Sequence, residues 1–346
     1  MKKLLVILFL LPLLSIHVSA SDIAMPPIPP SAEELLPQEH ESFSAGLWQL
    51  VTNAISKLHP EFAASLKLCV SLLTASLLMS LLQSFEGRSK ALGELAGVLV
   101  IAGILLGQTH SMIIMGTSAI QEISRYGALL LPVMTAALAS QGGISSSAAL
   151  YAATALFDNI LSSLIAVALV PMVYIYLVVA IVNAAAGDDL MKKLRDLIKW
   201  ALTWGLKIVL YLFTGYIGLT GIITGTADQT AVKATKLTIS GMIPVVGGIL
   251  SDASETVLVS AAAVKNTAGV AGLLTILAVT IMPFLTIALH YLMLKLTSAV
   301  SGIFAPKTMS SLVEDISVAM GLVLAMTGSV CLIQMISLVC FMKGMG

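Results

Sequence analysis

Residues 269–294 read GVAGLLTILAVTIMPFLTIALHYLML, a run that contains no Asp, Glu, Lys or Arg. A helix needs about 20 predominantly apolar residues to cross the roughly 30 Å of hydrocarbon in a bilayer. This run is long enough, and it would carry no permanently charged side chain into the lipid. It therefore predicts a helix that spans a membrane.

Runs of the same kind recur along most of the chain. Of its 346 residues, 58% are hydrophobic and 10% are charged, with a mean hydropathy of +1.00, whereas ordinary soluble domains carry about 25% charged residues. We predict an all-α, polytopic integral membrane protein with about six transmembrane helices, near residues 65–85, 91–115, 162–185, 200–224, 269–294 and 316–342.

The N-terminal region predicts a signal peptide followed by an exported segment. Residues 1–20 combine two lysines, an apolar core and small residues up to Ala20, the pattern of a cleaved signal peptide. Residues 21–42 carry five prolines and five acids, which predicts an extended extracytoplasmic tether. Apolar residues at helical spacing in 43–60 predict an amphipathic helix on the outer membrane surface. We assign 61–346 to a helical membrane domain.

Positive charge predicts the orientation of the spans. With the mature N-terminus outside, the connections at 86–90, 186–199 and 295–315 lie inside. Cytoplasmic loops are enriched in Lys and Arg, and these three hold Arg88, Lys90, Lys192, Lys193, Arg195, Lys199, Lys295 and Lys307. The outer segment 116–161 holds only Arg125. The second outer segment agrees less well with this rule, because it carries Lys233, Lys236 and Lys265.

The inner connection 186–199 has the pattern of an amphipathic helix. Asp188 and Asp189 stand at its expected start, where negative charge is favourable, and its apolar residues share one face: Leu190, Met191, Leu194, Leu197 and Ile198. Two interpretations stay open. The helix is a docking site for a cytosolic partner, or it is an interfacial linker in contact with anionic lipids.

An internal repeat is suggested by two apolar stretches with proline and polar breaks, 127–161 and 239–266. An offset of 112 residues separates Pro132 from Pro244 and Pro171 from Pro283, giving possible repeats 91–185 and 200–297. We expect two broken outer hairpins, the first containing Asp158. Broken segments at matching places point to a transport pathway or binding site; the alternative is amphipathic helices packed on the outer face.

The second stretch carries a specific signature. Residues 236–273, KLTISGMIPVVGGILSDASETVLVSAAAVKNTAGVAGL, resemble the signature region of the stage III sporulation protein AE family of endospore-forming bacteria, through Pro244, Gly247, Gly248, Asp252, Lys265 and Asn266. The resemblance extends over nearly the whole chain. It implies a membrane component of the channel complex that joins mother cell and forespore, in the mother-cell membrane surrounding the forespore.

The same resemblance implies protein partners. They are the other membrane and ring-forming subunits of the stage III sporulation A and stage II sporulation Q complex, and a cytosolic ATPase subunit that binds through 186–199. Lys plus Arg and Asp plus Glu number 18 each, so net charge gives no reason to expect a nucleic acid partner.

The signature also has a direct physical interpretation. Pro244 and the pair Gly247-Gly248 interrupt a helix and allow close backbone approach. Asp252 precedes Glu255 by three residues, the spacing of a helix capping box. The functional alternative is that these acids belong to a polar ring lining an aqueous passage.

Motifs of enzymes and metal sites are missing from the sequence. The cysteines Cys69, Cys331 and Cys340 fall inside apolar runs, and there is no HExxH, Walker or GxSxG motif. We therefore expect no enzyme activity and no cofactor. The leading hypothesis is a non-enzymatic subunit of the sporulation channel complex; the alternative is a secondary transporter with its site between the two broken hairpins.

The signature generates a prediction about its glycines. Gly247→Leu or Gly248→Leu should abolish function but leave insertion largely intact, because a branched side chain blocks close backbone approach. Asp252→Asn should be tolerated, since asparagine keeps the capping oxygen and costs at most about 1 kcal/mol. Spore counts, with membrane levels of each variant, provide the measurement. Loss of spores in Asp252→Asn at normal protein level would instead favour the aqueous passage.

Overall fold

A computed structural model describes residues 25–36, 42–85, 90–140, 144–219 and 267–344. Within these ranges the regular structure is helical throughout. The elements are α2 (Pro30–Glu33), α3 (Phe43–Lys57), α4 (His59–Phe85), α5 (Lys90–Ser140), α6 (Ile144–Ser163), the π-helical segment η3 (Leu164–Leu169), α7 (Val170–Ala186), α8 (Asp189–Leu219), α11 (Thr267–Ser301) and α12 (Lys307–Gly344).

Five stretches of the described helices are long and apolar enough to cross a membrane: His59–Leu82, Leu92–Ala137, Tyr151–Ala186, Gly269–Ser301 and Lys307–Val339. The predicted all-α polytopic membrane fold is confirmed. The remaining expected span, 200–224, begins inside α8 and continues past the residues that the structure describes, so the count of six stays a prediction.

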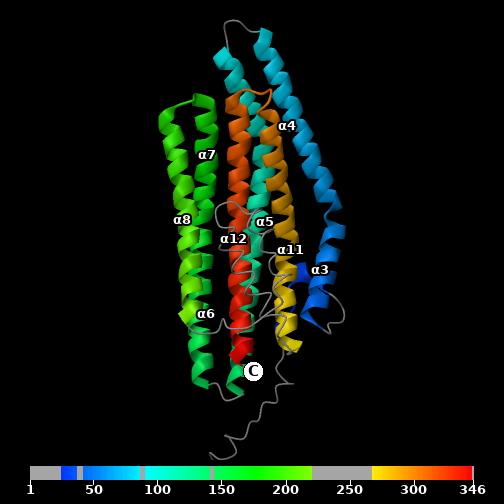
Figure 1. The fold of residues 1–346 in the computed structure, drawn as a ribbon, viewed down its shortest axis with the longest axis vertical. Coiled ribbons are helices and arrows are strands. Elements are labelled where there is room, and N and C mark those ends of the chain that lie inside the picture. The colour runs from blue at the N-terminus through cyan, green and yellow to red at the C-terminus, as the bar shows by residue number, and fades with distance from the viewer. Residues whose placement is uncertain (1–24, 37–41, 86–89, 141–143, 220–266, 345–346) are drawn as a thin grey trace, which may run out of the picture.

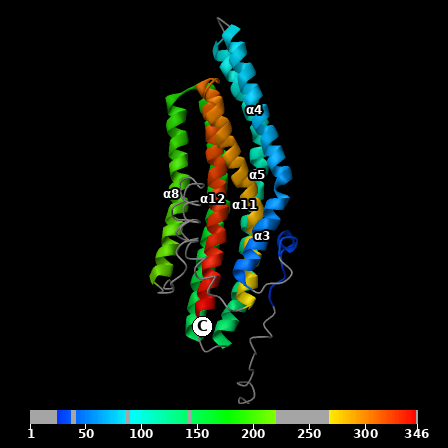
Figure 2. The ribbon, with the colours of Figure 1, turned by 45° about the vertical axis from the view of Figure 1, so that its right-hand side comes forward.

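Helix α12 is the centre of the bundle. It packs against α11, α5, α7, α6 and α8, and it lies in the middle of both ribbon views (Figure 1 and Figure 2). In its most apolar window 94% of the residues are buried by protein, against 22% in the corresponding window of α4. A helix that is apolar on all sides is expected in such a position, whereas α4 offers most of its surface to lipid.

Three helix connections share one end of the bundle. The end of α4, the start of α5, the α7–α8 turn and the α11–α12 turn all lie toward the upper end in Figure 1. They correspond to the three connections rich in Lys and Arg that we predicted to lie inside. The grouping agrees with the predicted alternation of the spans.

The α7–α8 turn follows from two residues. Gly187 ends α7 in the left-handed conformation, at φ 64°, which costs glycine no steric strain. Its backbone N–H donates to Asn183 O at 2.9 Å. The Asp188 carboxylate then accepts from the backbone N–H of Leu190 at 3.0 Å. The predicted helix start at Asp188 and Asp189 is therefore confirmed.

Two prolines lie inside helices without ending them. Helix α5 passes Pro132 and continues to Ser140, so the break that we expected at Pro132 is wrong; packed neighbouring helices make a proline tolerable inside a membrane helix. Pro283 likewise lies inside α11. Before Pro171 the helix widens into η3, in which Val170 N–H donates to Ile165 O. A π-helical segment of this kind leaves one backbone bond of the regular helix unmade, next to a proline that also lacks its N–H.

The N-terminal segment packs on the lower end of α11. Phe43, Leu50 and Ala54 of α3 are buried, and Gly46 lies against Leu274. Within the expected tether, Ala32 and Leu35 are also buried. The apolar stripe of α3 thus packs on protein along part of its length.

Close packing around α12 generates a stability prediction. Gly116→Ala should lower the unfolding temperature, because its new Cβ would lie 2.6 Å from Val323 Cγ1 and 3.2 Å from Thr327 Oγ1. Overpacking of this kind costs about 1–3 kcal/mol. Gly107→Ala, in the same helix with nothing within 4 Å, is the matched control and measures the gain in helix propensity, at most about 1 kcal/mol. Equal unfolding temperatures for the two purified variants would contradict this packing.

Candidate functional site

Two groups of residues, each containing buried polar side chains, lie on or against the central helix. We call Tyr176, Arg195, Asp196 and Asp315 the ionic cluster. We call Gly127, Asp158 and Gln334 the amide–carboxyl cluster. Both bring together helices that are distant in the sequence, and both place polar atoms where water is scarce.

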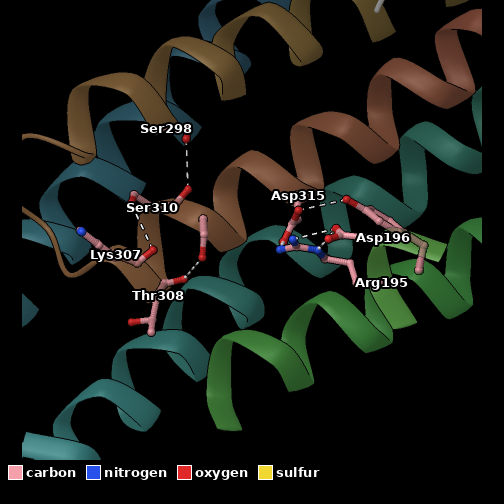
Figure 3. Close-up of polar contacts among 9 residues, drawn as sticks. Arg195, Asp196, Ser298, Lys307, Thr308, Ser310 and Asp315 are labelled. Atoms are coloured by element: carbon pink, nitrogen blue, oxygen red, sulfur yellow. Dashed lines mark hydrogen bonds and ion pairs between the residues drawn. The ribbon is translucent and has the colours of Figure 1, made fainter. Parts of the chain in front are cut away.

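The ionic cluster joins α7, α8 and α12 (Figure 3). Arg195 Nη1 lies 2.9 Å from Asp315 Oδ2, and Tyr176 donates its hydroxyl to Asp315 Oδ1 at 3.0 Å. Arg195 Nη2 also donates to Asp196 Oδ1 at 2.9 Å. Asp315 therefore has a charged donor on one oxygen and a neutral donor on the other. All of its hydrogen bonds come from other helices.

Burial makes this ion pair different from a surface pair. The side chains of Arg195 and Asp315 are only 15% and 9% exposed. Partial burial disfavours the charged guanidinium, but the hydrogen bond to Asp196 and the charge of Asp315 outweigh it and raise the pKa of Arg195. The arginine stays charged at any physiological pH. The pair thus fixes the first turns of α8 to the central helix.

A second polar group closes the α11–α12 turn beside the ionic cluster. Ser298 donates to Ser310 O at 3.0 Å, and Ser311 donates to Thr308 O at 2.9 Å. Lys295 forms an ion pair with Glu314 that is about half exposed. These bonds hold the turn in place but leave no titratable group buried without a partner.

The amide–carboxyl cluster lies further along α12. Asp158 on α6 is 7% exposed and Gln334 on α12 is 3% exposed, with the carboxyl beside the side-chain amide. Gly127 on α5 makes room for the amide, since a Cβ at that position would lie 2.2 Å from Gln334 Oε1. A larger residue at 127 would displace the amide from the carboxyl.

The residues predicted from the sequence fall into two sets. Seven lie outside the described residues: Pro244, Gly247, Gly248, Asp252, Glu255, Lys265 and Asn266. Of the others, Pro132 lies within α5, Pro171 at the start of α7 and Pro283 within α11. Asp158, which we expected in the first outer hairpin, lies buried on α6.

Sequence reasoning did not single out Tyr176, Asp315, Gln334 or Gly127. The sequence did contain one signal for the ion pair. Asp315 borders the apolar run 316–342, and Arg195 lies in the inner segment 186–199. Among the residues that the structure describes, no group of three or more His, Cys, Asp and Glu side chains could hold a metal ion. The described site therefore offers ion pairing and hydrogen bonding between helices.

Comparisons with known proteins identify relatives of the chain. The model of the family described as stage III sporulation protein AE matches residues 32–344. Stage III sporulation protein AE of Bacillus subtilis (strain 168) is 24% identical over 265 residues, an alignment that covers 75% of this chain and 66% of that relative. No solved structure matches the chain.

The buried ion pair generates a stability prediction. Asp315→Asn should destabilise the protein by roughly 1.5–3 kcal/mol, because Arg195 loses its buried carboxylate partner and keeps only the exposed Asp196. Glu314→Gln, one residue earlier in the same helix, removes only a half-exposed pair and should cost at most about 1 kcal/mol. Thermal unfolding of both purified variants provides the measurement. An unchanged unfolding temperature in Asp315→Asn would show that the pair does not stabilise the bundle.

Proposed function

Because the family model covers residues 32–344, the chain belongs to the stage III sporulation protein AE family, and we propose that it is a non-enzymatic membrane subunit of the channel complex that joins mother cell and forespore during sporulation. Membership supports a role in sporulation. Its place in a channel complex is the proposal, and it rests on the surface that α8 presents and on how that surface is joined to the bundle.

Helix α8 has a buried apolar face along its later turns and an exposed surface on its first turns. Its apolar face is buried in the bundle through Leu202, Leu206, Val209, Leu210 and Phe213. Its first turns present Leu190 and Leu197, which are 64% and 59% exposed, beside the exposed Lys192 and Lys193. Exposed leucines next to lysines can contact a protein surface that carries both apolar and acidic side chains. We propose that a cytosolic ATPase subunit of the complex docks there.

The Arg195–Asp315 ion pair is the observation that carries this proposal. It connects the exposed turns of α8 directly to α12, the helix that contacts most of the bundle. A partner that displaced the start of α8 would have to break or move a buried ion pair. Docking at the surface is thereby coupled mechanically to the core, as expected of a subunit that responds to an energising partner.

The same proposal gives the protein its location. We place it in the mother-cell membrane surrounding the forespore, with the mature N-terminus extracytoplasmic. The grouping of the cation-rich connections at one end supports this orientation. The opposite end, which carries α3, would then meet the other membrane and ring-forming subunits of the stage III sporulation A and stage II sporulation Q complex.

A secondary transporter is less well supported. That hypothesis depends on two matching broken hairpins, and the first is formed by α5 and α6, with α5 unbroken at Pro132. The second lies outside the described residues. A transporter should work alone, whereas a channel subunit should not.

The docking proposal is tested by crosslinking in sporulating cells. A photo-crosslinking residue in place of Lys193 should capture the ATPase subunit of the stage III sporulation A complex. The same residue in place of Ile208, further along α8 and 50% exposed, should capture none, because that position lies at lipid depth. Mass spectrometry identifies the adducts. If the Lys193 variant sporulates normally and yields no ATPase adduct, α8 is not the docking surface.

Co-purification tests the wider assignment. The tagged chain, extracted during engulfment, should bring down the other membrane subunits of the complex and the stage II sporulation Q protein. Recovery of the chain alone from cells that form spores normally would favour an independent transporter.

A further inference from the structure

Among the residues that the structure describes, no cation lies beside the buried acid Asp158. Asp158 is 7% exposed, and no described group forms a hydrogen bond to its Oδ1. It lies in a helical stretch, Tyr151–Ala186, that is apolar enough to span a membrane. An ionised carboxylate in such surroundings is costly unless a positive charge or several donors compensate it.

The helices packed on α6 supply no compensating charge among their described side chains. Glu122 on α5 accepts from Ser31 at 2.7 Å, and Tyr126 is hydrogen-bonded to Thr275. The other described titratable groups near this level of α5, α6, α8 and α12 are the exposed Arg125, the exposed Tyr151, Lys207 over the Trp204 ring, the exposed Tyr211 and the buried Cys331. η3, which also contacts α6, is entirely apolar.

Gln334 is the polar group placed beside Asp158, and its own bonding is incomplete. Its Nε2 is buried, and among the described residues it has no hydrogen-bond partner of good geometry. Other polar residues of α12 show the contrast, because Thr327 and Ser329 donate to the backbone oxygens of Val323 and Ala325 at 3.0 and 2.6 Å. The amide is also confined by Gly127. Asp158 and Gln334 therefore depend on each other for side-chain hydrogen bonds among the described residues.

A neutral carboxyl and a carboxylate form different hydrogen bonds with this amide. A carboxylic acid can donate its O–H to the amide oxygen and accept from the amide N–H, so the pair forms two hydrogen bonds. The amide oxygen and nitrogen are assigned to the positions that allow this bonding. A carboxylate can only accept. Asp315 shows the opposite solution at the same 7% exposure, since it is paired with Arg195 and Tyr176.

We propose that Asp158 is an exchangeable protonation site in the core of the bundle, held as a neutral acid against Gln334 when α6 packs on α12. The ligand is a proton. Loss of that proton leaves an uncompensated negative charge between the two helices and weakens their contact. The site thereby makes the packing of α6 on α12 sensitive to pH, a property that the sporulation assignment neither contains nor requires.

The first test compares the pH dependence of stability in wild type and Asp158→Asn. If folding favours the protonated acid, stability from this group is greatest at low pH and is lost as pH rises. Asparagine imitates the neutral acid and cannot titrate. The wild type should therefore lose several degrees of unfolding temperature relative to Asp158→Asn between about pH 5 and about pH 9. A difference between the two proteins that is the same at every pH overturns the proposal.

The second test uses Asp315 as a matched control within the same protein. Dicyclohexylcarbodiimide is an apolar reagent that adds to protonated carboxyls: the acid proton moves to a reagent nitrogen, the carboxyl oxygen bonds the central carbon, and rearrangement gives a stable acylurea without loss of atoms. Peptide mass spectrometry should find this addition at Asp158 and not at the ion-paired Asp315. Modification of Asp315 to the same extent as Asp158 contradicts the distinction on which the proposal stands.

Discussion

Burial of nearly the whole apolar length of the central helix is the constraint on which the bundle depends. Because protein surrounds α12, each polar group on it needs a partner within the bundle. Thr327 and Ser329 solve this locally by bonding to their own backbone. Asp315 and Gln334 cannot do so, and neighbouring helices have to bring partners to them. The positions of α6, α7 and α8 around α12 are tied to those two residues.

Two equally buried acids illustrate how surroundings decide chemistry. Asp315 receives a guanidinium and a phenol from α8 and α7, so its charge is compensated and it fixes these helices. Among the described residues Asp158 receives only an amide, and the Nε2 of that amide has no described hydrogen-bond partner. The first arrangement is suited to a permanent structural joint. The second is suited to a group that exchanges a proton, because the described residues around the buried carboxyl supply no cation to compensate its charge.

The functional proposal follows from the same architecture. A subunit that receives force from a cytosolic partner needs a surface segment attached firmly to its core. Helix α8 provides this: exposed leucines and lysines occupy its first turns, and Arg195 connects those turns to Asp315. Apolar packing alone would resist sliding less well, since lipid and leucine surfaces interact with similar energies.

The sequence by itself determined that the chain is an all-helical membrane protein, because long uncharged apolar runs have no other stable solution in a bilayer. It also determined the α8 start at Asp188 and Asp189, since capping depends on residues close in sequence. Only the tertiary structure decided that Arg195 meets Asp315, that Gln334 lies over Gly127 beside Asp158, and that α5 continues through Pro132. Helical periodicity tells which residues share a face, but it contains no information about which distant helix that face will meet. The partners of the buried polar groups were therefore hidden until the helices were packed together.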